Sequence, residues 1–147
     1  MGTLTLPASG IIYLDTAPII YSVEKHSDYW PLLRPMWESS SSKQIEIISS
    51  DLALLETLVG PLKKGDNALV QDYEQLLTAT EVRLMPITAS ILREAARLRA
   101  TLNFKTPDAI HAASALAAGC VQFITNDTDF RRVQLLPVTI LKEVLGS

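Results

Sequence analysis

Four acidic residues that are far apart in the sequence stand where a fold can bring them to one place. Asp15 directly follows the uncharged run IIYL, and Asp127 comes two residues after the run VQFIT. Asp108 falls in the expected first turn of one helix, and Glu56 borders the apolar residues of another. Because ligands bind at the carboxyl ends of the strands in open parallel sheets, we expect these four carboxylates to converge there.

Such a cluster of carboxylates needs a partner of opposite charge. Carboxylates within about 4–6 Å of one another raise each other's pKa, which destabilises the fold or leaves some of them protonated. Mg²⁺ or Mn²⁺ removes this conflict, since these ions prefer carboxylate oxygens and keep positions open for water and a substrate phosphate. They also lower the pKa of water and stabilise the attacking and leaving oxygens of a phosphodiester. The pattern therefore predicts metal-dependent hydrolysis.

Short apolar runs predict the strands that carry these residues. The runs lie at residues 11–14, 44–49, 82–87, 121–125 and 135–141. They are rich in β-branched residues, and Pro137 favours the sheet edge for the last of them. Their alternation with helical segments predicts an α/β fold, a three-layer α/β/α sandwich with a mostly parallel sheet of about four or five strands.

Helix signals fill the segments between the strands. We expect helices over residues 18–24, 28–38, 51–59, 67–78, 90–102 and 106–118, with Ser50 or Asp51 capping the third helix, Gly60 and Pro61 ending it, and Thr88 capping the fifth. Thr106 is expected to cap the last helix, Pro107 suits its first turn, and Gly119 ends it. Ile91, Ala95, Leu98 and Leu102 are expected in the core.

Glu56 lies on the expected helix at residues 51–59. There Leu52, Leu55 and Val59 form an apolar stripe at i, i+3 and i+7 that we expect in the core. Because Glu56 is one turn from two of these residues, we expect its carboxylate to face inward or to lie at the border of the core. The alternative is a solvated glutamate at the edge of a short helix.

Composition limits the classes of protein to which the chain can belong. Its 147 residues, 48% hydrophobic and 20% charged, suit one domain over residues 1–147 with a flexible leader at residues 1–10. The sequence lacks a long apolar run or signal peptide, so we expect a cytoplasmic protein without a membrane partner. The single Cys120 excludes an internal disulfide. A net charge of −3 means that nucleic acid would need a local basic patch.

Four segments match a known family in their order and spacing. They are IIYLDTAPIIY, SSDLALLETLVGP, KTPDAIHAASALAAG and FITNDTDF. Over residues 11–141 the chain resembles PIN-domain ribonucleases and, among them, VapC-like toxins of type II toxin–antitoxin pairs. The resemblance implies an endoribonuclease that forms a homodimer and is inhibited by an antitoxin bound beside the acidic residues. It implies one or two Mg²⁺ or Mn²⁺ ions held among Asp15, Glu56, Asp108 and Asp127, with Thr125 as a nearby hydroxyl.

Each acidic residue has an expected role within this resemblance. Asp15 and Asp108 are the expected main metal ligands, and Asp127 completes the site. Asp129 matches a more variable acidic position and can ligate through water, so the sequence does not rank Asp127 above it. Glu56 is expected to orient the attacking water or to take its proton. The residues expected to hold the RNA phosphate are Arg93, Arg97 and Lys105.

Several alternatives remain open at this stage. His111, one turn after Asp108, either supports that carboxylate or is a partly buried helix histidine with a local partner. A haloacid-dehalogenase-type phosphatase needs a second aspartate at position 17, which is Ala17, and a receiver domain needs an acidic pair near the first strand. The alternative function is a non-catalytic PIN-like module that binds RNA or a partner protein and holds a structural ion.

Overall fold

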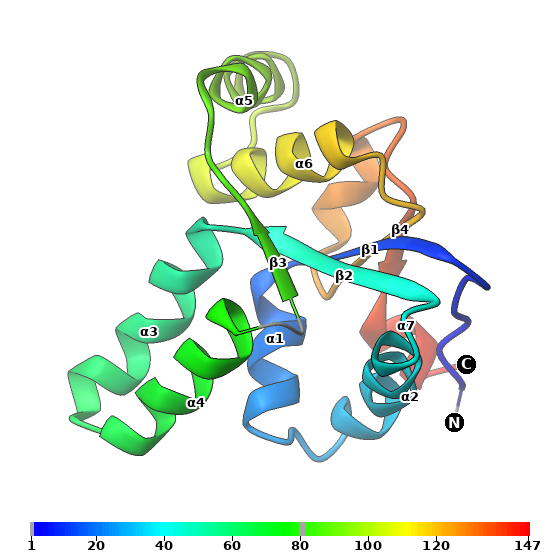
Figure 1. Ribbon diagram of the computed structural model, residues 1–147. Coiled ribbons are helices and arrows are strands. Elements are labelled where there is room, and N and C mark those ends of the chain that lie inside the picture. The colour runs from blue at the N-terminus through cyan, green and yellow to red at the C-terminus, as the bar shows by residue number, and fades with distance from the viewer. Residues whose placement is uncertain (1, 80–81) are drawn as a thin grey trace.

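The first strand of the chain lies at the centre of the sheet (Figure 1). A computed structural model describes residues 2–79 and 82–147. The strands are β1 (Gly10–Leu14), β2 (Ile45–Ser50), β3 (Val82–Met85), β4 (Gln122–Thr125) and β5 (Val138–Ile140). They form a five-stranded sheet of order β3-β2-β1-β4-β5, in which every neighbouring pair is parallel. The predicted α/β fold is confirmed.

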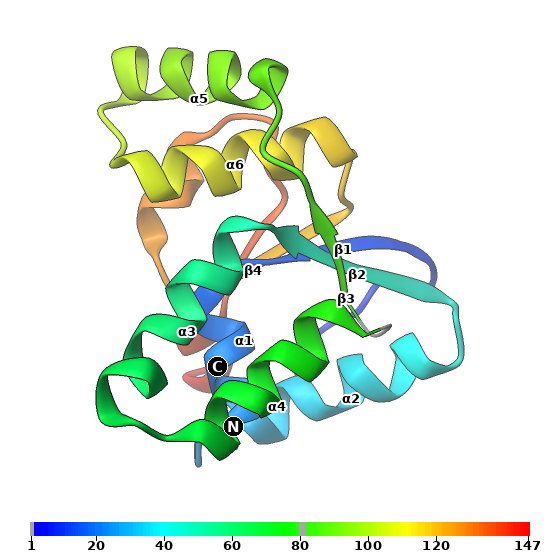
Figure 2. The same ribbon diagram turned by 60° about the vertical axis from the view of Figure 1, so that its left-hand side comes forward.

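Helices cover both faces of this sheet. They are α1 (Thr16–Val23), α2 (Trp30–Ser41), α3 (Leu52–Lys64), α4 (Asn67–Thr78), α5 (Ala89–Leu102), α6 (Thr106–Ala118) and α7 (Leu141–Leu145), with a 3-10 turn η1 (Thr128–Arg132) after β4. Figures 1 and 2 show α6 on one face with α5 on its outer side, and α1, α2 and α7 on the other face. The pair α3 and α4 extends away from the sheet.

Alternate residues of β1 enter the two cores that separate these layers. Tyr13 packs with Phe123 and with α5 and α6, and the two rings stack with centroids 5.2 Å apart. Ile12 and Leu14 pack with the helices on the opposite face. A strand that is buried on both faces explains why the run IIYL bears no charge.

Small residues let α6 pack between the sheet and α5 (Figure 2). Ala109, Ala112, Ala113 and Ala115 are all at most 1% exposed. Interiors are close-packed, so larger side chains at these positions would push the layers apart. Gly119 ends α6 at a φ of 65°, as predicted.

Helix α3 is longer than predicted. It continues through Gly60 and Pro61 to Lys64. The left-handed residue that ends it is Gly65, at a φ of 68°, which lets the chain turn into α4. Both signals for an end at Gly60 and Pro61 were therefore wrong.

The core face of α3 also differs from the prediction. Its buried residues are Ala53, Thr57 and Pro61, whereas Leu55 is 61% and Val59 is 42% exposed. The prediction that these two residues lie in the core was wrong. Thr57 can occupy the core because its hydroxyl donates to the Ala53 carbonyl oxygen at 2.8 Å.

Two further predicted boundaries are wrong. The N-cap of α6 is Lys105, and the Thr106 hydroxyl instead accepts a hydrogen bond of 2.8 Å from Arg99 Nη1. The expected strand at residues 135–141 is shorter, because Leu141 begins the short helix α7.

The leader lies against the domain within the described residues. Leu4 is 5% exposed, and the Thr5 carbonyl oxygen accepts a hydrogen bond of 3.0 Å from Gln122 Nε2. Met1 lies outside the described residues. Among residues 2–79 and 82–147, none of the helices has the length and hydropathy of a membrane span.

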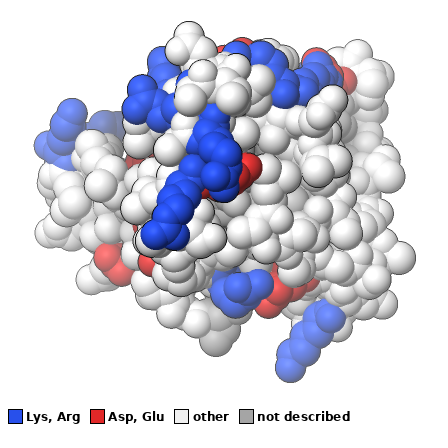
Figure 3. Space-filling view, turned by 90° about the horizontal axis from the view of Figure 1, so that it is seen from above, with Lys and Arg blue, Asp and Glu red and all other residues white. Residues whose placement is uncertain are grey.

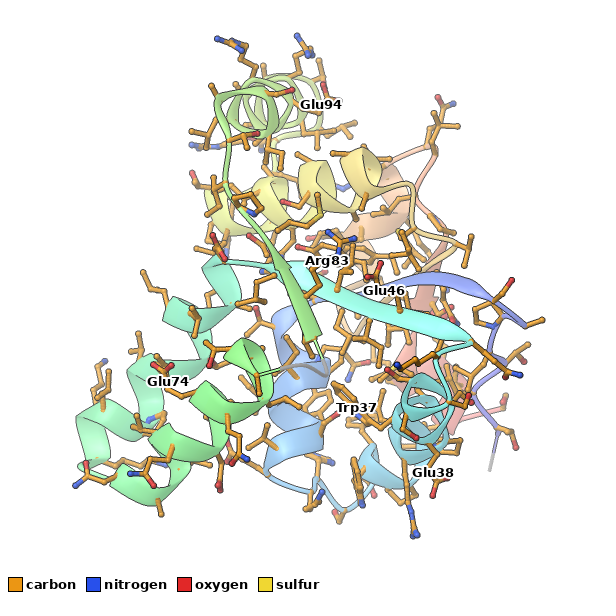
Figure 4. The ribbon with its side chains drawn as sticks, viewed as in Figure 1. Trp37, Glu38, Glu46, Glu74, Arg83 and Glu94 are labelled. Carbon is orange, nitrogen blue, oxygen red and sulfur yellow. The ribbon has the colours of Figure 1, made fainter. Side chains whose placement is uncertain are left out.

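An ion pair on the exposed surface joins the edge strand β3 to its neighbour β2. Arg83 on β3 and Glu46 on β2 point toward each other (Figure 4), with Nη2 and Oε1 3.1 Å apart. Both side chains are about half exposed, so their contribution to stability is small, at about 0–1 kcal/mol.

Candidate active site

The candidate site lies at the carboxyl ends of β1 and β4. The chain adds β2 and β3 on one side of β1 and returns to place β4 on the other. In open parallel sheets the crevice at such a reversal of strand order is where ligands bind. Asp15 follows β1 and Thr125 ends β4, and the Thr125 hydroxyl donates to Asp15 Oδ2 at 2.7 Å.

Asp15 also caps α1. Its Oδ1 accepts the backbone N–H of Thr16 at 2.8 Å, so the helix begins at Thr16, two residues before the predicted start at Pro18. Hydrogen bonds to both carboxylate oxygens hold this side chain in one orientation. The N-terminus of α1, which is the positive end of the helix dipole, also lies beside this carboxylate.

Asp127 is tied to Asp15 through Thr125. The Thr125 hydroxyl accepts the Asp127 N–H at 3.1 Å while it donates to Asp15. Asp127 Oδ1 in turn accepts the Asp129 N–H at 2.9 Å, which begins the turn η1. The Asp129 side chain is 62% exposed and lies 4.0 Å from Arg132.

Asp108 lies in an environment of like charge. It is in the first turn of α6, half-buried. Burial, followed by the negative charges of Asp15 and Asp127 and a smaller contribution from Glu56, raises the pKa of Asp108 to about 6, and His111 partly opposes this. The negative charges of Asp15, Asp127 and Glu56 therefore act on the Asp108 carboxylate.

Glu56 has the opposite environment. Its Oε1 accepts hydrogen bonds from the Thr16 hydroxyl and from His111 Nε2, each 2.7 Å long. Burial alone raises the pKa of Glu56, but these hydrogen bonds outweigh it and hold the pKa below its ordinary value. The side chain is 26% exposed, at the border of the core as expected.

The partner of His111 is Glu56, whereas one of the two interpretations of the sequence paired it with Asp108. The imidazole is 1% exposed, and its Nδ1 lies 2.7 Å from the Tyr13 hydroxyl. Sequence reasoning missed Tyr13 and Thr16. The one available signal was their position beside Asp15 in the run IIYLDT.

The donor set suits a hard divalent cation. All four converging residues are carboxylates, and a cation among them would relieve the repulsion that raises the pKa of Asp108. Within residues 2–79 and 82–147, no three His, Cys, Asp or Glu side chains have the arrangement to hold an ion together. Mg²⁺ typically uses only one or two carboxylates and takes its other ligands from water and substrate phosphates. One or two of the predicted ligands Asp15, Asp108 and Asp127 would suffice for that manner of binding.

The predicted RNA-binding residues lie on α5 and at the N-cap of α6. Lys and Arg side chains gather on the face of the molecule that α5 covers (Figure 3). Arg93 and Arg97 are exposed there, although Arg97 Nε pairs with Glu94 Oε2 at 2.8 Å. Lys105 is three residues before Asp108. Arg132, which was not singled out as an RNA ligand, lies over the Phe104 ring at 4.6 Å.

Comparison with solved structures identifies similar folds. VapBC2 from Rickettsia felis, bound to a DNA fragment from their promoter, is 22% identical with a TM-score of 0.71, over 88% of this chain and 98% of that chain. VapC20 from Mycobacterium tuberculosis, a sarcin-ricin loop cleaving toxin, is 18% identical with a TM-score of 0.69, over 84% and 95%. VapBC-1 from nontypeable Haemophilus influenzae is 20% identical with a TM-score of 0.67, over 90% and 98%. At these identities the likeness is one of fold.

Comparison with protein families gives the clearest assignment. No curated protein matches the sequence. The model of the PIN domain family matches residues 12–136, which include the last three residues of β1, all of β4 and the four acidic residues Asp15, Glu56, Asp108 and Asp127. Because this match covers most of the chain, the protein belongs to the PIN domain family.

Proposed function

We propose that the protein is a Mg²⁺- or Mn²⁺-dependent endoribonuclease and the toxin of a toxin–antitoxin pair. The observation that carries this proposal is the convergence of Asp15, Glu56, Asp108 and Asp127 where the strand order reverses. The raised pKa of Asp108, which comes from burial and then from the charges of Asp15 and Asp127, supports this proposal, because a bound cation would offset both.

The four carboxylates divide the chemistry between them. Asp15 and Asp108 hold the cation with Asp127, and Asp129, on the exposed side of η1, contributes through water. When bound, the cation supplies positive charge that lowers the pKa of water and stabilises the phosphodiester oxygens. Glu56 orients the attacking water and takes its proton. Water adds to phosphorus as the bond to the leaving oxygen breaks, and that oxygen is protonated from solvent.

Binding of RNA is assigned to the exposed basic residues. Arg93, Arg97 and Lys105 neutralise backbone phosphates on either side of the cleaved bond. Because the net charge of the chain is −3, affinity comes from this local group and falls steeply as salt is added.

The partners are proposed from the similar structures. A further similar structure, VapBC-5 from Mycobacterium tuberculosis, is described as a member of the VapBC family of toxin–antitoxin systems, and VapC20 is described as a toxin that cleaves the sarcin-ricin loop. We assign to this chain a cognate antitoxin that covers the acidic site, a homodimeric state and a cytoplasmic location, where its RNA substrate is found.

Cleavage of RNA by the purified protein tests the activity. Mn²⁺ or Mg²⁺ should support cleavage, EDTA should abolish it, and Asp15→Asn and Asp108→Asn should be inactive. Asp72→Asn, an exposed residue of α4, serves as the matched control and should retain full activity. Equal cleavage by wild type and both site variants would indicate a contaminant, and binding of metal without cleavage would favour the non-catalytic module.

Expression in a bacterial host tests the role as a toxin. Wild-type protein should arrest growth, and Asp108→Asn should not. Normal growth with soluble wild-type protein would contradict the toxin assignment while leaving the nuclease assignment intact.

A further inference from the structure

A buried chain of hydrogen bonds runs from the core to Glu56. The Tyr13 hydroxyl, on β1, lies 2.7 Å from His111 Nδ1, on α6. His111 Nε2 lies 2.7 Å from Glu56 Oε1, on α3. Tyr13 is fully buried and His111 is 1% exposed, so no solvent competes for these bonds. Three elements therefore meet through one imidazole ring.

The proton positions in this chain follow from the Glu56 end. The pKa of Glu56 lies below its ordinary value, so its carboxylate is ionised and accepts hydrogen bonds only. A lone pair on His111 Nε2 at 2.7 Å would repel it, so Nε2 carries the proton. A neutral imidazole has one N–H, and Nδ1 must then accept from the Tyr13 hydroxyl.

We propose that Tyr13 and His111 are positioning residues for Glu56: the Tyr13 hydroxyl fixes the ring orientation and the Nε2–H tautomer of His111, and that N–H aims the Glu56 carboxylate at the attacking water. This inference rests on the nuclease function proposed above. Such positioning matters because Glu56 is on a helix whose side chains Leu55 and Val59 are exposed, and its carboxylate is held by hydrogen bonds from other elements. The Thr16 hydroxyl supplies the second fixed hydrogen bond to the same oxygen.

The geometry separates this role from simple packing. Tyr13→Phe keeps the ring that stacks on Phe123 and removes only the hydroxyl. His111→Gln keeps an N–H donor for Glu56 but lacks the ring nitrogen that accepts a hydrogen bond from the Tyr13 hydroxyl. His111→Leu removes the donor altogether. A matched control is Tyr73→Phe, which removes a buried phenol that donates to Glu24 at the opposite core.

Steady-state cleavage of RNA gives the first test. Tyr13→Phe should lower kcat about tenfold, and His111→Leu about 100-fold, with KM and Mn²⁺ affinity close to those of the wild type. His111→Gln should recover part of the loss seen with His111→Leu. Adding Tyr13→Phe to His111→Leu should cause no further loss, because Tyr13 acts only through the imidazole. Additive losses, or an equal loss in Tyr73→Phe, would overturn the proposal.

Nitrogen NMR of the imidazole gives a second test that does not depend on activity. At alkaline pH, His111 in the wild type should show a protonated Nε2 and an unprotonated, hydrogen-bonded Nδ1. In Tyr13→Phe the Nδ1 signal should move to that of a nitrogen without a hydrogen bond. A proton on Nδ1 in the wild type, alone or together with one on Nε2, would overturn the proposal. An inactive wild type with the expected spectrum would count against the nuclease function and leave this arrangement in place.

Discussion

Helices α6 and α3 each bring one carboxylate to the same site but hold it in opposite electrostatic environments. Asp108, on α6, faces the charges of Asp15 and Asp127, and its pKa is raised to about 6. Glu56, on α3, accepts hydrogen bonds from Thr16 and His111, and its pKa is lowered. When two neighbouring carboxylates differ in this way, their environments indicate different chemical roles.

The packing of the two helices is also opposite. Helix α6 is buried on most sides by alanine contacts, so the position of Asp108 is fixed by the core. Helix α3 exposes Leu55 and Val59, and the position of Glu56 is fixed by hydrogen bonds to residues of other elements. Core packing of α6 can hold the Asp108 carboxylate in place despite repulsion from neighbouring carboxylates. On the less buried α3, hydrogen-bond donors are needed to hold the Glu56 carboxylate.

Substitution of Glu56 should give the largest effect on rate. Glu56→Gln removes the proton acceptor, so kcat should fall by about 10²–10⁴-fold while Mn²⁺ affinity stays close to that of the wild type. Single-turnover cleavage and calorimetric titration of Mn²⁺ measure the two quantities. Glu38→Gln, on the exposed side of α2, is the matched control. A loss of Mn²⁺ affinity in Glu56→Gln would make Glu56 a ligand and remove the contrast with Asp108.

Substitution of Asp108 should act on metal binding instead. Asp108→Asn should weaken Mn²⁺ binding by about tenfold or more, because substitution of residues that hold or orient a metal ion lowers its affinity by this order. Without metal its melting temperature should match or exceed that of the wild type, because the repulsion from Asp15 and Asp127 is relieved. Asp129→Asn should weaken Mn²⁺ binding less, since that side chain is 62% exposed. A lower melting temperature of Asp108→Asn in EDTA would contradict this account.

The pH dependence of stability should report the same repulsion. The folded pKa of Asp108, about 6, lies above its ordinary value of 3.8, so the folded state holds the proton more tightly. The contribution of Asp108 to stability therefore decreases as pH rises from about 4 to about 6 and stays unfavourable above that range. Denaturant titrations in EDTA at several pH values measure this change. The difference between the wild type and Asp108→Asn should grow with pH, and a constant difference would contradict the prediction.

Substitution on the exposed surface of α3 should have the smallest effect. Leu55→Ser should change the free energy of unfolding by no more than about 0.5 kcal/mol, because Leu55 is 61% exposed. Ala112→Leu on α6 should cost about 1–3 kcal/mol by overpacking, because Ala112 is completely buried. Urea titration of both variants tests the difference. A large loss in Leu55→Ser would mean that this face of α3 is covered in solution.

The sequence predicts the strands of this fold better than the faces of its helices. The runs before Asp15 and Asp127 are apolar on both sides and rich in β-branched and aromatic residues, a pattern typical of a buried parallel strand. Helix α3 has apolar residues on two faces, and periodicity cannot tell which face packs, so Leu55 and Val59 were misplaced.

Prediction of the site from the sequence is limited for a similar physical reason. The place of each acidic residue could be predicted because it depends on where the strand or helix that carries it begins or ends. The bonds among Tyr13, His111 and Glu56 join residues 98 and 55 positions apart, and no local pattern specifies them. They depend on how closely α6 and α3 approach the end of β1.

The central position of β1 has a consequence for synthesis on the ribosome. Strand β1 can pair with β4, its neighbour on one side, only after β4 has been made. The hydrogen bond between Asp15 and Thr125 joins residues 110 positions apart. Loops of this length close slowly, and chains emerge from the N-terminus. An incomplete chain that ends before β4 lacks Thr125 and Asp127, so the acidic site can be completed only after residue 127 has been translated.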